Sequence, residues 1–358
     1  MTGKGKIRYV FTSSHTKQGF YTFIPTLLGG MKKVYVLKGA PGAGKSSLIR
    51  SLGQELCQRG YEVDFWLSAE DAMNPEGLYI SQLESAVVNG NLPVAIDPKY
   101  PGLSGSIVNL SEYLDELALN QHGPQIIDLV EEIEKRSLQA GIILQEASAI
   151  REGMGSGYCG RIDRSKLNRL IEELKEEIFK IQPGAKHYFA TSFTSEGMIN
   201  YLEEISTCCK IRYFLKGRAG AGKVINELAT KAKERGHSLE YYHCGLSCDQ
   251  LIMLIISNLQ VAIIDGSDME ILLRPGDRLV DLDQCWDDQG EYREGLEHSA
   301  GQRQYESLLL QAQAELEAAQ KARRNLKRLY SAAMNFELLE EKKKEIFQSL
   351  IGSAEKIK

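Results

Sequence analysis

Long apolar segments are missing from this sequence. No run approaches the ~18 apolar residues that a membrane-spanning helix needs, and the first residues, MTGKGKIRYVFTSSH, lack the apolar core of a signal peptide. These absences predict a cytoplasmic protein with no membrane partner. A strong excess of positive charge is missing too, since the net charge is -5 and the pI about 5.8. This balance argues against a surface built to bind nucleic acid.

Cysteines paired at the CxxC spacing of metal or redox sites are also absent. The seven cysteines are odd in number and scattered, and none has CxxC spacing. A soft metal cluster could combine His243, Cys244 and Cys248 with Cys208 and Cys209. Without the paired spacing of metal ligands, we favour reduced, buried thiols instead.

What is present is an ordinary globular composition, with 43% hydrophobic and 25% charged residues, in a chain long enough for about two domains. An internal repeat supports two. FTSSHTKQGF from Phe11 matches FATSFTSEGM from Phe189, and VYVLKGAPGAGKSS around Lys45 matches RYFLKGRAGAGKVI around Lys223. Both matches have an offset of 178 residues (189 − 11 and 223 − 45). We therefore expect a duplicated unit.

The boundary between the copies falls near Pro183-Gly184, so we expect one domain over 1–183 and a second over 184–358. In each copy a strand should enter a glycine loop, followed by a helix, a second strand, another helix and a third strand. This order is typical of an α/β fold with a parallel sheet and helices on both faces. The expected strands are Val34–Leu37, Val63–Trp66 and Ala86–Val88 in the first copy, and Tyr213–Leu215, Leu239–Tyr242 and Val261–Ile264 in the second.

After its α/β core, each copy becomes long, charged and helical, with apolar residues near helical spacing. We expect a helical hairpin at about 120–182 and another at about 299–352, each packed on the core of its own domain. No strict heptad repeat is sustained, so an extended coiled coil is not favoured.

The segment GAPGAGKS, Gly39–Ser46, lies between an expected strand and an expected helix. Glycines let a backbone turn tightly and point N–H groups at phosphate oxygens. Lys45 would act as the catalytic cation on the β- and γ-phosphates, and the Ser46 hydroxyl would bind Mg²⁺. The segment is thus interpreted as a P-loop. The sequence does not decide between adenine and guanine, but the absence of the guanine-reading NKxD motif favours ATP. The expected nucleotide-binding residues are Gly39, Ala40, Pro41, Gly42, Ala43, Gly44, Lys45, Ser46 and Ser47.

The second copy has a degenerate version of this loop. It keeps Gly217, Gly220, Gly222 and Lys223, but Val224 stands where the Mg²⁺-binding hydroxyl belongs. We expect this loop to bind nucleotide weakly, or without normal metal geometry.

A P-loop enzyme also needs a carboxylate at the end of a neighbouring strand to orient Mg²⁺. Asp97, after the apolar run Leu92–Ile96, is one candidate and is the second expected catalytic residue; Asp265 is the candidate in the second copy. The repeat, however, aligns AVVNG with AIIDG, and so Asn89 with Asp265. On this alignment Asn89 reaches Mg²⁺ through a water without adding charge, and neither copy has the full metal set.

Other candidates have two interpretations each. His15 would lie near the nucleotide or serve in packing. Glu70 and Asp71, after the second strand, would supply an activating carboxylate or have a helix-capping or solvated role. Arg161 and Arg164, in a glycine-rich link, would belong to a mobile lid or to an ordinary exposed loop.

These motifs resemble the P-loop NTPase superfamily. The tandem arrangement resembles, over essentially the whole chain, a little-characterised bacterial family of ATPases and ATP-binding proteins, which implies ATP and Mg²⁺ as cofactors. We predict a cytoplasmic ATP-binding protein with weak or regulated ATPase activity at Lys45 and Ser46, and a regulatory second domain. Two alternatives stay open. One is a small-molecule or nucleotide kinase with Asp97, Arg161 and Arg164 at its acceptor site; the other is a nucleotide-sensing scaffold for an unknown protein partner.

Overall fold

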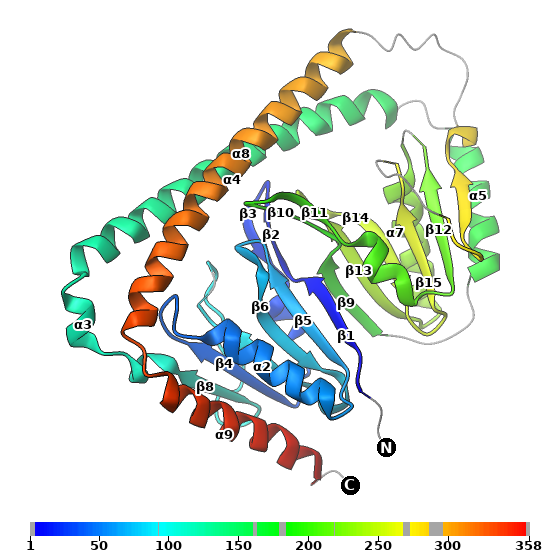
Figure 1. The fold of residues 1–358 in the computed structure, drawn as a ribbon. Helices are drawn as coiled ribbons and strands as arrows, with labels where there is room; N and C mark the ends of the chain where they lie inside the picture. The colour runs from blue at the N-terminus through cyan, green and yellow to red at the C-terminus, as the bar shows by residue number, and fades with distance from the viewer. Residues whose placement is uncertain are drawn as a thin grey trace.

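The computed structural model describes residues 4–91, 93–159, 163–178, 184–217, 219–267, 273–285 and 296–355. They form an α/β fold on one mixed sheet of 12 strands, flanked by helices (Figure 1). No helix among these residues has the length and apolar character needed to cross a membrane. Residues 4–178 are called the first half below, and residues 184–355 the second half.

The two halves contribute six strands each to this sheet. Those of the first half lie in the order β1-β5-β6-β7-β4-β8, and those of the second in the order β9-β13-β14-β15-β12-β16. The sets join where β1 and β9 pair antiparallel, at Phe11 and Phe189. The first set is β1 (Ile7–Phe11), β4 (Lys33–Lys38), β5 (Val63–Ser68), β6 (Asp71–Ile80), β7 (Ser85–Asn89) and β8 (Gly105–Asn109). The second set is β9 (Gly184–Phe189), β12 (Ile211–Lys216), β13 (Ser238–Cys244), β14 (Ser247–Ile256), β15 (Val261–Asp265) and β16 (Arg278–Asp281).

All six expected strands are confirmed, as β4, β5, β7, β12, β13 and β15. The parallel sheet is corrected to a mixed one, because β6 and β14 stand where a helix was expected and run antiparallel to both neighbours. Two-residue turns, Ala69-Glu70 and Gly245-Leu246, return the chain at once as hairpins. The run Leu251–Ile256 is buried throughout, which is typical of a strand covered on both faces. Periodicity does not separate such a run from a buried helix.

Helices and two small hairpins surround the sheet. The hairpins pair β2 (Ser13–Thr16) with β3 (Gly19–Thr22) and β10 (Thr191–Thr194) with β11 (Gly197–Asn200). The helices are α1 (Ile24–Leu27), α2 (Lys45–Gln58), α3 (Glu116–Asn120), α4 (Gly123–Cys159), α5 (Arg164–Ile178), α6 (Leu202–Ile205), α7 (Ala221–Glu234), α8 (Leu296–Ala332) and α9 (Phe336–Glu355).

Helix α2 follows the first glycine loop and packs on the sheet. Its apolar residues recur at helical spacing, and Leu48, Leu52 and Leu56 are buried against Phe65 and other side chains of the sheet. Helix α7 repeats the pattern in the second half, where Val224, Ile225, Leu228 and Ala232 are buried. These two helices fix the position of the two glycine loops.

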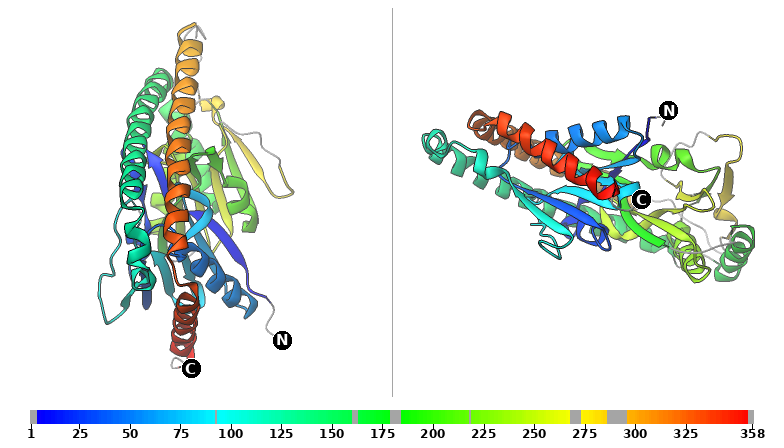
Figure 2. Two further views of the ribbon diagram at one scale, coloured as in Figure 1. Left: turned by 60° about the vertical axis from the view of Figure 1, so that its left-hand side comes forward. Right: turned by 90° about the horizontal axis from the view of Figure 1, so that it is seen from below.

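The expected hairpins are replaced by an exchange of helices between the halves. The long helices α4 and α8 pack along each other, side by side in Figures 1 and 2. Helix α9 then packs on α2 of the first half, and α5 packs on α7 of the second. A helix of 37 residues spans about 55 Å, enough to carry the chain along the sheet. An apolar stripe shows that a helix is covered, but not by which core, so the sequence could not reveal the exchange.

Candidate functional site

The loop Gly39–Gly44 connects β4 to α2 and depends on its glycines. Gly39, Gly42 and Gly44 have φ of 144°, 88° and 82°, a region that residues with a Cβ rarely adopt. Gly44 is the N-cap of α2, so the positive end of the helix dipole faces the loop. This geometry suits an anion.

Lys45 is the buried cation of this loop, with 7% of its surface exposed. Its Nζ donates to the carbonyl oxygens of Gly39 and Ala40, the second at 2.8 Å. The pKa of Lys45 is lowered to about 8, mainly by burial and secondly by repulsion from the charge of Lys327. Both acceptors are neutral, so an anion in the loop would stabilise the ammonium better than they do. Of the other expected site residues, Ala43 is buried, Ser46 half-buried and Ser47 exposed.

The strand ends beside the two loops match in register. Asn89 pairs with Leu37 across β7 and β4, and Asp265 pairs with Leu215 across β15 and β12. Asn89 and Asp265 therefore occupy equivalent positions in the strand register of the two halves, as the alignment of the repeat predicts. Both side chains accept a backbone N–H two residues on, at 3.1 Å. At this position the first half has a neutral amide where the second has a carboxylate.

Asp97 does not end a strand, contrary to expectation. Leu92 lies outside the described residues, and Pro93–Ile96 contributes only a bridge between Asn91 and Ala95. Pro93 cannot donate to a strand ladder, which explains the difference. The Asp97 carboxylate is exposed and forms an ion pair of 2.9 Å with Lys38.

The second loop has a different local structure. Gly217 and Gly220 keep positive φ values of 152° and 103°, but α7 begins at Ala221, so Gly222 lies inside the helix. Lys223 is exposed, and the neighbouring Val224 is fully buried. Thus the apolar residue that replaces serine packs in the core, and the lysine is not enclosed as Lys45 is.

Helices α8 and α9 of the second half cover the first loop, which sequence reasoning missed. The Ser331 hydroxyl donates to the carbonyl oxygen of Gly42 at 2.9 Å. A Cβ at Gly42 would collide with the carbonyl oxygen of Lys327, and one at Gly44 with the side chain of Leu339. The motif glycines are therefore also required for close packing of these helices.

The residues after β5 meet the same helix. Lys327 binds Asp71 with 2.7 Å between Nζ and Oδ2, Arg323 forms an ion pair with Glu70, and His15 lies 3.0 Å from Glu70. Although burial opposes it, the contacts with His15 and with the charge of Arg323 hold the pKa of the Glu70 carboxyl below its usual range. Neither Glu70 nor Asp71 caps a helix. The charges of α8, spaced by four residues at 323 and 327, are the signal that could have indicated this contact.

A pocket of about 240 Å³ opens beside Lys327. It is bounded by the start of β6, by the turn between β10 and β11, and by α8. Its polar lining combines carboxylates and cations, with Asp71, Asn74, Glu196, Gln320, Arg324 and Lys327. Both halves of the chain thus contribute to this space.

The residues expected at a kinase acceptor site are not gathered. Arg164 begins α5, which packs on α7 of the second half, whereas Asp97 lies by β4 of the first. Strands β12 and β4 lie near opposite ends of the sheet (Figure 1). Arg161 lies outside the described residues.

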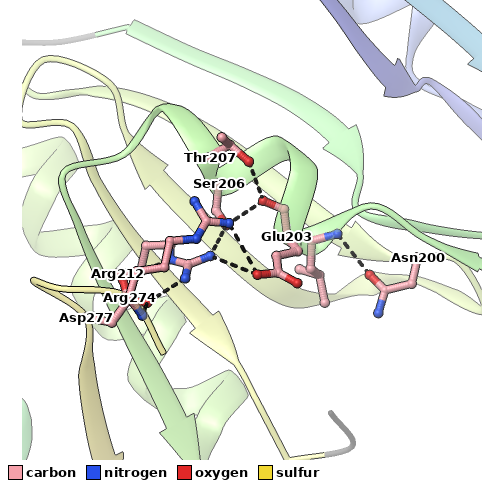
Figure 3. Close-up of polar contacts among 8 residues, drawn as sticks. Asn200, Glu203, Ser206, Thr207, Arg212, Arg274 and Asp277 are labelled. Atoms are coloured by element: carbon pink, nitrogen blue, oxygen red, sulfur yellow. Dashed lines mark hydrogen bonds and ion pairs between the residues drawn. The ribbon is translucent and has the colours of Figure 1, made fainter. Parts of the chain in front are cut away.

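A second charged cluster, in the second half, connects β12 to the segment before β16 (Figure 3). Arg212 is 1% exposed and donates to Asp277 at 2.9 Å, while Arg274 lies 3.2 Å from Glu203. The hydrogen bond from Arg212 holds the pKa of the Asp277 carboxyl below its usual range. Charges on both sides are matched, so this cluster stabilises the fold.

Metal chemistry and comparisons add no further constraint. Among the described residues, no group of three or more His, Cys, Asp or Glu side chains could hold a metal ion. Cys57, Cys244 and Cys285 are buried free thiols, as expected. Cys208 is an exposed free thiol and Cys209 and Cys248 are half-buried ones, so burial was wrongly expected for these three. Neither a protein-family model, nor a curated protein, nor a solved structure matches this chain.

Proposed function

We propose that this chain binds ATP with Mg²⁺ at Gly39–Ser46 and hydrolyses it slowly. The observation that carries the proposal is Lys45, a buried ammonium that donates to the neutral carbonyls of Gly39 and Ala40, within a glycine loop at the start of α2. A triphosphate would replace those carbonyls with charged oxygens and would accept the loop N–H groups. Adenine as the base, and the cytoplasm as the compartment, stay predictions from the sequence.

Slow hydrolysis follows from the expected metal ligands. Mg²⁺, when bound, neutralises charge on the phosphates and orients them for attack by water. In the first half, the Ser46 hydroxyl and the Asn89 amide oxygen suit a hard cation but supply no charge. The phosphates themselves would have to hold the ion, so we expect binding to be stronger than turnover.

The second half, in this proposal, is a degenerate copy with a structural and regulatory role. The equal strand order of the two halves and the shared register of Asn89 and Asp265 support a duplication. The exposed Lys223 and the buried Val224 argue against a working phosphate site at its loop.

The test is equilibrium binding of ATP and release of phosphate by the purified chain, with Lys45→Ala and its matched control Lys223→Ala. We expect Lys45→Ala to abolish binding and Lys223→Ala to retain it, with turnover low in both the wild type and the control. Equal loss in the two variants would refute the assignment to the first loop. No binding by the wild type would refute the function.

A second candidate, a nucleotide-sensing scaffold, is favoured by the contact of Ser331 with Gly42, because an occupied loop would press on helices from the other half. It predicts binding with no phosphate release at all. Protease protection of α8 and α9, compared with and without ATP, would separate the two: a sensor changes its cleavage pattern.

A further inference from the structure

Lys327 belongs to the second half, but it lies against the first glycine loop. Its carbonyl oxygen is close enough to Gly42 to exclude any side chain there, and Ser331, one turn later on α8, binds the Gly42 carbonyl. The backbone of α8 is thus held against the loop at this point.

Lys327 also lines the neighbouring pocket. Its Nζ is 2.7 Å from Asp71 Oδ2, which also accepts from Asn74 Nδ2 at 3.0 Å. Its charge is felt at Lys45, since it contributes to the lowered pKa there. Arg324, one turn earlier, lines the same pocket. Lys45 of the first half and Lys327 of the second half are therefore two cations beside one loop that is suited to an anion.

We propose that Lys327 is a phosphate-binding residue at the first loop. When a nucleoside triphosphate binds, the Lys327 ammonium exchanges its ion pair with Asp71 for a contact with the outermost phosphate. This inference rests on the proposed function. The ion pair with Asp71 is suited to such an exchange because Lys327 is 39% exposed, and pairs this exposed are weak. A phosphate, with up to two charges and several acceptor oxygens, is a better partner for an ammonium. A diphosphate has no third phosphate at this place and would gain less.

The test uses three variants of the full chain, each measured for the Kd of ATP and of ADP. Lys327→Ala should weaken ATP binding about tenfold, because one charge-assisted hydrogen bond is lost, and should change ADP binding little. Asp71→Asn keeps the side-chain shape but removes the competitor of the phosphate, and should strengthen ATP binding several-fold. Lys321→Ala, on an exposed part of the same helix, is the matched control and should change neither.

Opposite signs for Asp71→Asn and Lys327→Ala are the decisive outcome, because a merely structural ion pair would give the same sign for both. Equal effects in these two variants, or a Kd in Lys327→Ala equal to that of Lys321→Ala, would overturn the inference. Failure of the proposed function looks different: the wild type would not bind ATP, or Lys45→Ala would bind it normally. Urea unfolding of Lys327→Ala, with Lys327→Arg as the charge-retaining variant, separates loss of contact from loss of fold.

Discussion

Leu339 of α9 packs directly over Gly44, the N-cap residue of α2, so that a single methyl group at position 44 would overlap its side chain. Leu339 is 5% exposed and belongs to the same core as Leu48 and Ile49 of α2. The start of the loop helix is therefore sealed by a helix that begins 292 residues later (336 − 44). The proposed nucleotide binding and the packing of the exchanged helices would thus depend on the same glycines.

Gly44→Ala is expected to destabilise the chain by about 2–3 kcal/mol, from backbone strain and from collision with Leu339. Gly30→Ala is the matched control, since Gly30 has φ of 78° and nothing within 4 Å of a Cβ, so it shows strain alone at about 1 kcal/mol. Urea unfolding measures both. The double variant Gly44→Ala/Leu339→Ala should lose less stability than the sum of the losses in the two single variants. Equal costs for Gly44→Ala and Gly30→Ala would show that α9 does not press on the loop.

ATP affinity is expected to fall as pH rises through about 8. Lys45 has a pKa of about 8, and only the protonated lysine attracts phosphate, so each further pH unit costs up to about tenfold in Kd. Lys45→Arg stays protonated and should remove this dependence while lowering affinity at pH 7. Binding titrations from pH 6.5 to 9.5 measure it. A wild-type profile identical to that of Lys45→Arg would exclude the role of the lysine.

The buried carboxyl of Glu76 is expected to make the free energy of unfolding depend on pH. It is buried, accepts from Thr12 at 2.7 Å and Ser13 at 2.8 Å, and burial raises its pKa from 4.5 to about 7. A raised pKa favours the folded state below pH 4.5, and this contribution is lost as pH rises to about 7. Glu76→Gln should therefore gain about 2–3 kcal/mol relative to the wild type between pH 5 and pH 8. Urea unfolding at both pH values tests it, and a constant difference would contradict the buried proton.

Asp277→Asn is expected to destabilise the fold by about 3 kcal/mol, because it leaves the guanidinium of Arg212 buried without its main carboxylate. Glu55→Gln, which breaks the exposed pair with Arg59, is the comparison and should cost less than about 0.5 kcal/mol. Urea unfolding gives both values. If the two variants cost the same, the cluster in Figure 3 contributes little to stability.

Local chemistry was accessible from the sequence. The glycine loop was identified because only glycine adopts the φ values of Gly39, Gly42 and Gly44 at no cost, and because a strand and a helix were visible on either side. The repeat aligned Asn89 with Asp265, and these residues have equivalent partners in the sheet, Leu37 and Leu215. Asp97 misled because its apolar run resembles a strand, whereas Pro93 prevents one.

Which segments cover which loop was decided only by the tertiary structure. The helices after the glycine loops and the long C-terminal helices of each half were predicted at their places, but an apolar stripe fits any complementary core, so nothing local shows that α9 packs on α2 and α5 on α7. For the same reason Lys327 and Asp71, 256 residues apart, could not be paired from the sequence. The sequence determined the residues that suit a phosphate and the turns that hold them. The fold decided that both halves of the chain meet at that loop, because the burial of long helices is satisfied by contacts that no local pattern specifies.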